Sequence, residues 1–223
     1  MKLEVVADER AAARRAAELI AGVAVAAASE RGSFSLAMSG GRSPWLMLAI
    51  LGDEETMPWG RTELFQVDER IASPGSQERN LTHMVLGLSI DHQASLRPMP
   101  VTQRDLEGAA RQYESSLPER LDCVHLGLGA DGHTASLIPG DPVLDVTDRW
   151  VAVTENAYEG HRRMTLTYPA LATARQIVWL VTGEDKRDAL AKLLAGDRSI
   201  PAGRVDNDEM VVVADEAAAP TPA

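Results

Sequence analysis

The chain has 223 residues, of which 45% are hydrophobic, 4% aromatic and 25% charged, and its formal net charge at pH 7 is −11. This composition is typical of one large globular domain whose core consists mainly of aliphatic side chains. The acidic excess argues against a nucleic-acid partner, because binding to phosphate backbones requires clustered Lys and Arg side chains.

Short apolar segments alternate with helical segments along the chain. In chain order, the predicted elements are a strand at 3–7, a helix from 8 to about 29, a strand at 34–38, a helix from 43 to about 52, a strand at 64–67, a helix at 106–117, strands at 121–126, 150–154, 164–167 and 177–182, a helix at 184–195 and a strand at 210–213. Asp8 is a suitable N-cap for the first helix, and Ser43 followed by Pro44 is a typical helix start.

Strands that alternate with helices predict an α/β fold, with helices on both faces of a largely parallel, Rossmann-like sheet. We expect a single domain at 1–215 and a frayed, Ala/Pro-rich tail at 216–223. Ligands of such sheets bind beyond the carboxyl ends of the strands. Three loops that follow predicted strands, at 39–43, 68–70 and 127–133, are therefore expected to converge on one rim.

The first loop contains Gly40 and Gly41 directly before a helix start. Glycines allow the backbone N–H groups to turn toward a ligand, and a helix N-terminus favours negative charge, so this loop suits a phosphate group. The alternative is a tight turn between strand and helix. In the second loop, Asp68 and Glu69 precede Arg70, and a neighbouring carboxylate could orient this guanidinium toward an anion; the alternative is a solvated run of surface charges.

The third loop reads GLGADG at 127–132, which matches the G-x-G-x-x-G pattern of dinucleotide sites. Three features argue against that interpretation. The loop lies late in the chain, only a short helical segment follows it, and no acid stands at the end of a clear following strand near position 150. His133 follows, and a histidine can take a proton from water while a carboxylate such as Asp131 holds its ring. The alternative is a structural histidine.

Two basic residues lie next to later predicted strands. Arg163 opens the strand at 164–167, and Lys186 lies at the start of a helix, where its charge is unfavourable to the helix dipole unless an anion binds there. Each of them, taken alone, is more often a plain surface charge.

We expect no metal and no cofactor. The remaining histidines, His83, His92, His125 and His161, show no pairing with one another or with Cys123 at the spacing of metal ligands. The sequence also lacks the G-x-S-x-G pattern of serine hydrolases.

The single cysteine, Cys123, excludes an internal disulfide and suits a reducing compartment. The first ten residues do not have the pattern of a signal peptide, and the longest apolar stretch, 16–28, is too short to span a bilayer. We therefore expect a cytoplasmic location.

Four segments together resemble the 6-phosphogluconolactonases. They read SGGRSP at 39–44, DER at 68–70, Asn at position 80 and GLGADGHTASLIP at 127–139, and the similarity extends over nearly the whole chain. The resemblance implies the fold shared with glucosamine-6-phosphate deaminases and ribose-5-phosphate isomerases. It also implies hydrolysis of 6-phospho-D-glucono-1,5-lactone to 6-phosphogluconate, the second step of the oxidative pentose phosphate pathway.

The resemblance further implies roles for individual residues. His133 would activate water, through either ring nitrogen, and Asp131 would position it, while Arg70 is a candidate donor to the oxyanion. The implied substrate-binding residues are Gly40, Gly41, Arg42, Ser43, Asp68, Asn80, Gly129, Arg163 and Lys186. The expected partner is a small phosphorylated sugar lactone, without nucleic acid or membrane, and the expected state is a monomer or small homo-oligomer.

The related deaminases are the main alternative. They usually carry Tyr after Asp-Glu and Ala-Phe-Asn-Glu after the histidine, whereas this chain has Arg70 and ASLIP at 135–139. The chain departs from the lactonases in having Ile138 for Phe, Arg79 for Ser, and no prolines at 158–162. A non-catalytic sugar-phosphate sensor and a dinucleotide-dependent oxidoreductase are further alternatives.

Overall fold

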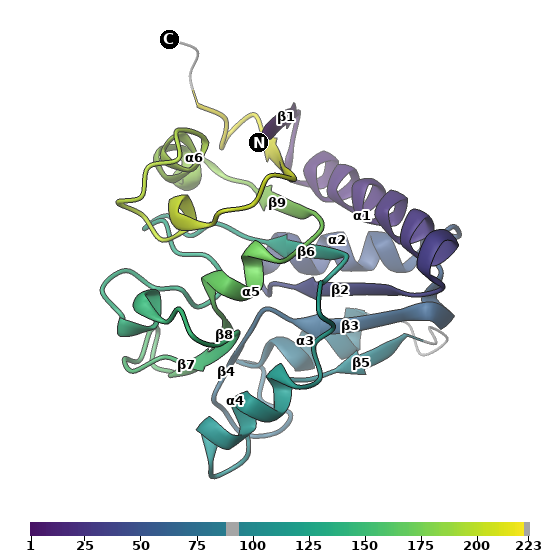
Figure 1. The fold of residues 1–223 in the computed structure, drawn as a ribbon. Coiled ribbons are helices and arrows are strands. Elements are labelled where there is room, and N and C mark those ends of the chain that lie inside the picture. Colours follow the sequence, from purple (N-terminus) through teal and green to yellow (C-terminus); the bar gives the residue numbers. More distant parts are fainter. Residues whose placement is uncertain (88–93, 221–223) are drawn as a thin grey trace.

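The computed structural model describes residues 1–87 and 94–220. Its main sheet is parallel throughout (Figure 1). The strand order is β1 (Lys2–Val6), β10 (Met210–Asp215), β9 (Ile177–Val181), β6 (Cys123–Leu126), β2 (Phe34–Met38), β3 (Thr62–Gln66) and β5 (Ser95–Arg97). Met38 of β2 pairs with both Gln66 of β3 and His125 of β6, so these strands end at one edge of the sheet.

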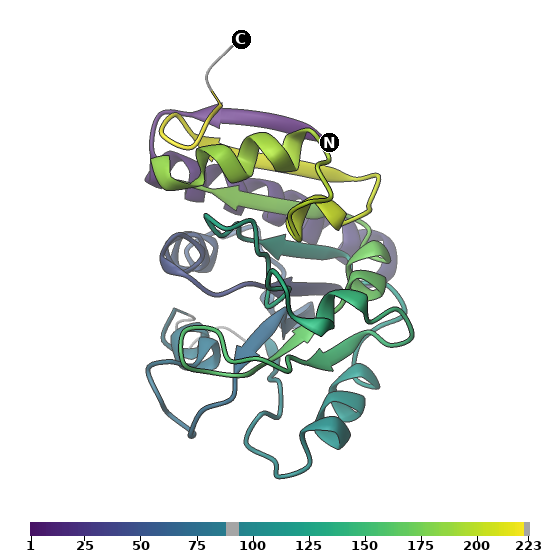
Figure 2. The same cartoon turned by 90° about the vertical axis from the view of Figure 1, so that its left-hand side faces the viewer.

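Helices cover both faces of this sheet, as Figure 2 shows for α1 and α6. One face packs against α1 (Glu9–Arg31), α2 (Arg42–Gly52) and α3 (Asn80–Gly87), and the other against α4 (Leu106–Glu114), α5 (Tyr168–Ala172) and α6 (Arg187–Leu194). Short 3₁₀ turns lie at η1 (Trp59–Arg61), η2 (Pro142–Asp145), η3 (Glu184–Lys186) and η4 (Ala202–Arg204). The predicted α/β layering with a largely parallel sheet is confirmed.

The long helix α1 illustrates why the sequence folds this way. Asp8 caps it by accepting a hydrogen bond of 2.8 Å from the N–H of Ala11, and Gly32 ends it with a φ of 81°. A φ in this region favours glycine, which is why the helix ends there. The buried face of α1 is almost entirely alanine, so the helix can approach the sheet closely.

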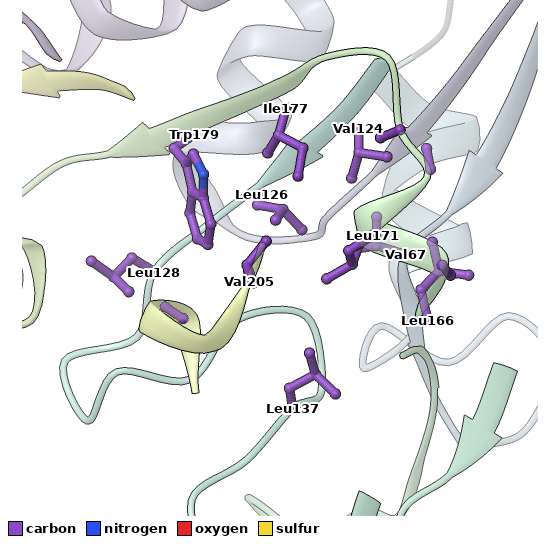
Figure 3. Packing of buried hydrophobic residues seen from close by; sticks show 14 of the residues in the cluster. Val67, Val124, Leu126, Leu128, Leu137, Leu166, Leu171, Ile177, Trp179 and Val205 are labelled. Carbon is purple, nitrogen blue, oxygen red and sulfur yellow. The ribbon is translucent and has the colours of Figure 1, made fainter. Parts of the chain in front are cut away.

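The sheet separates two hydrophobic clusters. Figure 3 shows the cluster on the α5 and α6 face, where Trp179 of β9 and Leu126 of β6 pack toward Val205. The other cluster joins α1 and α2 to side chains such as Phe34 and Leu180. Because both faces are covered, the inner strands β2 and β9 are buried along their whole length.

A second, antiparallel sheet consists of β4 (Asp68–Arg70), β8 (Arg163–Leu166) and β7 (Val151–Val153). The prediction of a loop at 68–70 is therefore wrong, because this segment pairs with β8. Strand β5 and helices α3 and α5 are likewise absent from the predicted elements; strand β4 and strand β5 have only three residues each, too few for a sequence pattern to be recognised.

The predicted tail at 216–223 lies partly outside the described residues, which end at 220. In its described part, the N–H of Glu216 donates to the carbonyl of Val6 and Ala218 is fully buried. The frayed tail stays a prediction. The single domain at 1–215 stays a prediction. No helix within 1–87 and 94–220 is long and apolar enough to cross a membrane.

Candidate functional site

A cavity of about 420 Å³ lies at the carboxyl ends of β2, β6 and β9. Eleven of the twelve predicted site residues line it: Gly40, Gly41, Arg42, Ser43, Asp68, Arg70, Asn80, Gly129, His133, Arg163 and Lys186. The twelfth, Asp131, contacts His133. The three loops expected to converge do therefore meet on one rim, although the roles assigned to their residues stay predictions.

The glycine loop leads into α2. Gly41 is the N-cap residue with a φ of 132°, and the N–H groups of Arg42 and Ser43 fall in the first turn, where a helix offers them no carbonyl acceptor. Gly40 lies against the side chain of Asn80, so closely that an added Cβ would collide with the amide group. The loop thus requires glycine at position 40. Its residues line the cavity, and the N–H groups in the first turn of a helix are suited to an anion.

Ser43 does not cap α2 as predicted, since Gly41 takes that position. Its hydroxyl donates instead to Glu9 at 2.7 Å and lies 2.7 Å from the hydroxyl of Thr182. Arg42, which is largely exposed, also pairs with Glu9 at 3.0 Å. The hydrogen bond from Ser43 holds the pKa of Glu9 below its usual value, against the effect of burial. These contacts anchor the first turn of α2 to the start of α1.

His133 and Asp131 form a hydrogen-bonded pair. Nδ1 of His133 lies 2.6 Å from Oδ1 of Asp131, and the backbone N–H of His133 donates to the same oxygen at 3.1 Å. Although burial opposes it, these hydrogen bonds and the imidazole keep the pKa of Asp131 below its usual value. Gly129 leaves no room for a Cβ beside the pair, so the third loop also requires its glycine.

The segment after His133 is not helical, contrary to the short helix expected there. Thr134 and Leu137 form an isolated bridge, and the N–H of Gly129 donates to the carbonyl of His133 at 2.8 Å. The loop is therefore closed on itself and does not present a helix N-terminus, as a dinucleotide site would require. His133 is held by backbone contacts on both sides.

Asp68 forms a buried polar wall of the cavity. Its carboxylate accepts a 2.6 Å hydrogen bond from the hydroxyl of Ser136 and a 3.3 Å hydrogen bond from the amide of Asn80. Burial raises the pKa of Asp68, although Ser136 and the charge of Arg163 oppose this. The hydrogen bonds fix the orientation of both Asp68 and Asn80.

Glu69 points away from the cavity. Its carboxylate accepts the backbone N–H of Arg70 at 2.9 Å. Side chains alternate across a strand, and because 68–70 is a strand, Asp68 and Arg70 face the site while Glu69 is fully buried.

The cations of the cavity have acidic partners within the protein. Nη2 of Arg163 lies 3.1 Å and Nη2 of Arg70 lies 3.4 Å from the same carboxylate oxygen of Glu159. Lys186 pairs with Asp185 at 3.0 Å. An incoming anion must therefore compete with these carboxylates for the cations.

Several residues of the site were not identified in the sequence. Tyr158 contacts His133, Asp131 and Arg163, and Glu159 bridges the two arginines. Both lie in the segment 158–162. Its lack of the prolines usual in the lactonases was the sign in the sequence that the site differs there. Trp45 and His83 also line the cavity, with stacked rings 5.4 Å apart.

Within the described ranges, no three or more His, Cys, Asp or Glu side chains are grouped so that they could hold a metal ion. His92 lies outside these ranges. His125 is fully buried, and burial lowers its pKa to about 3, so it stays neutral in the core.

Comparisons with known proteins agree with this architecture. Residues 7–213 match the family described as glucosamine-6-phosphate isomerases/6-phosphogluconolactonase. A 6-phosphogluconolactonase from Synechocystis sp. is 36% identical over 182 residues, which cover 76% of this chain and 75% of that protein. A solved 6-phosphogluconolactonase structure from Shewanella baltica has a TM-score of 0.87 at 24% identity, covering 96% of this chain and 97% of that one.

A solved monomeric glucosamine-6-phosphate deaminase has a TM-score of 0.83 at 19% identity, and the alignment covers 98% of both chains. The predicted likeness to the deaminase fold is thus confirmed. Because lactonases and a deaminase share this fold, the fold alone does not distinguish their reactions.

Proposed function

The chain belongs to the glucosamine-6-phosphate isomerase/6-phosphogluconolactonase family and hydrolyses 6-phosphogluconolactone in the pentose phosphate pathway, and we propose that His133 is the general base of this reaction. The observation that supports this most directly is the His133–Asp131 pair, which lies on the same cavity as the glycine loop at the start of α2. The base and the anion site thus face one substrate-sized space.

The pair also supports Nε2 as the nitrogen of His133 that would act. An ionised carboxylate only accepts hydrogen bonds, so the 2.6 Å contact with Asp131 places the proton of the neutral imidazole on Nδ1. Nε2 then carries the free lone pair. This nitrogen would take a proton from a water molecule that attacks the lactone carbonyl carbon.

Attack produces a tetrahedral oxyanion, which needs hydrogen-bond donors. Arg70 is the candidate among the side chains, and the N–H groups of a glycine turn are the candidates from the backbone. Collapse of the intermediate breaks the bond to the ring oxygen, which receives the proton from Nε2 of His133. No covalent intermediate with the protein is needed.

Lys186 is proposed to bind the phosphate group. Replacing it with alanine is expected to raise KM about tenfold with little change in kcat, because a charge-assisted contact to a part of the substrate remote from the reaction is lost equally in ground and transition states. Lys192→Ala, on the exposed face of α6, is the matched control. An unchanged KM in Lys186→Ala would exclude Lys186 from phosphate binding.

Glu159 is expected to compete with the substrate phosphate. Its carboxylate holds both Arg70 and Arg163, so Glu159→Gln should lower KM by about two- to fivefold, in line with the strength of exposed ion pairs. Glu155→Gln, an exposed acid four residues earlier, should leave KM unchanged. A rise of KM in Glu159→Gln would mean that Glu159 supports the substrate rather than opposing it.

The test of the function is hydrolysis of freshly prepared 6-phosphogluconolactone, corrected for the spontaneous rate, beside the unphosphorylated lactone. We expect a rate enhancement that is much larger for the phosphorylated substrate. Release of ammonia from glucosamine 6-phosphate would support a deaminase instead. The 1,5-lactone as the preferred ring form, the monomeric or small oligomeric state and the cytoplasmic location are parts of this proposal; the single free cysteine, buried Cys123, supports the location.

A further inference from the structure

Tyr158 lies between the two parts of the site that the proposed reaction uses. Its hydroxyl is 3.2 Å from Oδ2 of Asp131, its ring meets the edge of the His133 ring at a centroid distance of 5.2 Å, and the guanidinium carbon of Arg163 is 5.2 Å from its ring centroid. We propose that Tyr158 is a positioning residue that links His133, the general base, to Arg163, a cation of the cavity. The proposal rests on the function assigned to His133.

On the side of the base, Tyr158 completes the set of donors to Asp131. Oδ1 of Asp131 accepts from His133, and Oδ2 accepts from the phenol, so both oxygens of the carboxylate are held. Burial and the charge of Asp131 raise the pKa of Tyr158, which therefore keeps the proton that it donates. With the carboxylate fixed in one plane, the imidazole is held with Nε2 free.

The edge contact between the two rings adds a second constraint. The ring planes of Tyr158 and His133 are inclined at 61°, an arrangement that aromatic pairs favour. Rotation of the imidazole about its Cβ–Cγ bond would break both this contact and the hydrogen bond to Asp131. Tyr158 therefore restricts the direction in which Nε2 points.

Tyr158 also contacts Arg163, a cation that lines the cavity. Nη2 of Arg163 donates to the backbone carbonyl of Tyr158 at 3.3 Å, and the guanidinium lies over the phenol ring. Arg163 is 5% exposed, so its position depends closely on these neighbours. An anion that binds to Arg163 therefore contacts a guanidinium that packs on Tyr158, and Tyr158 also donates a hydrogen bond to Asp131.

The backbone of Tyr158 is itself fixed. Its N–H donates to the carbonyl of His161 at 2.9 Å, and the N–H of His161 donates back at 3.2 Å, which closes a tight turn. Nε of Arg162 donates to the carbonyl of Thr154 at 2.8 Å and holds this turn against the end of β7. Tyr158 is thus presented on a rigid support, as a positioning residue requires.

Two substitutions separate the functions of the hydroxyl and the ring. Tyr158→Phe removes only the hydrogen bond to Asp131, so kcat is expected to fall about three- to tenfold with KM nearly unchanged. The pH below which kcat/KM declines should also rise, because Asp131 becomes a stronger acceptor for protonated His133. Tyr158→Leu also removes the ring under Arg163 and should raise KM in addition.

Tyr168→Phe is the matched control, because its hydroxyl donates to the carbonyl of Pro201 at 2.9 Å and does not line the cavity. Wild-type kcat and pH profile in Tyr158→Phe would overturn the proposal, and so would an equal loss of kcat in Tyr168→Phe, which would indicate general destabilisation. The proton NMR signal of the His133 Nδ1–H group provides a readout without turnover, and it should shift in Tyr158→Phe. If wild-type protein does not hydrolyse the lactone, the proposed function is wrong. An unchanged NMR signal in Tyr158→Phe would refute the role of Tyr158 alone and would leave the proposed function standing.

Discussion

Replacing His133 with alanine is expected to reduce kcat by about 10²- to 10⁴-fold, the range in which a lost general base usually falls. The lactone is an activated ester, so orientation of the substrate by the cations and N–H groups of the cavity should leave some residual rate. KM should change little, because the proposed role of His133 lies in activating water rather than in holding the substrate. Steady-state kinetics with 6-phosphogluconolactone, corrected for spontaneous hydrolysis, measures both parameters.

His161→Ala is the control for this substitution, since the side chain of His161 does not line the cavity. Its kcat should stay close to that of the wild type. The decline of kcat/KM toward acid pH should also disappear in His133→Ala, because the protonation of the imidazole is its proposed cause. Full activity of His133→Ala would exclude His133 as the base, whatever the geometry of its contact with Asp131.

The parts of the fold that the sequence predicts are those with strong local patterns. The run at 34–38 is bounded by turn residues and is buried throughout, and Asp8 together with Gly32 delimits α1. The order of the strands in the sheet cannot be obtained from such patterns, because it depends on contacts between distant segments. The expectation that three loops share one rim nevertheless held, since β6, β2 and β3 are parallel neighbours.

The parts that the sequence does not predict depend on tertiary contacts. Strand β4 exists because its backbone pairs with β8, nearly a hundred positions later in the chain, and this pairing decides that Glu69 faces the core. The proposed role of Tyr158 depends in the same way on a turn that brings it beside Asp131. Neither the three-residue charged run nor an isolated tyrosine carries a periodic signal.

The net charge of −11 creates an overall field that is unfavourable for binding an anion. Among the described residues that line the cavity, Arg42, Arg70, Arg163 and Lys186 are cationic, and Asp68, Glu159 and Asp185 are acidic. The cations are gathered locally, but each has an acidic partner. The site is therefore close to electrically balanced without substrate, and we expect the phosphate to compete with an internal carboxylate for its cation.

Glu69→Ala is expected to lower the free energy of unfolding by about 3–5 kcal/mol, because it removes one partner of a buried ion pair. The carboxylate of Glu69 lies 3.4 Å from Nε of Arg79, whose side chain is 6% exposed. It also accepts hydrogen bonds of 2.8–2.9 Å from four N–H donors, the side chain of Gln66 and the backbones of Arg70, Asn80 and Leu81. Removing it leaves a buried charge and these donors without their acceptor.

The matched control is Glu63→Ala on β3, where Glu63 forms an ion pair of 2.7 Å with Arg97 at the surface. Both substitutions delete a glutamate that pairs with an arginine, but the pair at Glu63 is solvated and should contribute about 0–1 kcal/mol. Urea denaturation of the two variants measures the difference. Because Glu69 joins β4 to the start of α3, its loss should also displace Asp68 and Asn80 and reduce activity, so equal stability of the two variants would contradict the view that this buried carboxylate holds one wall of the site in place.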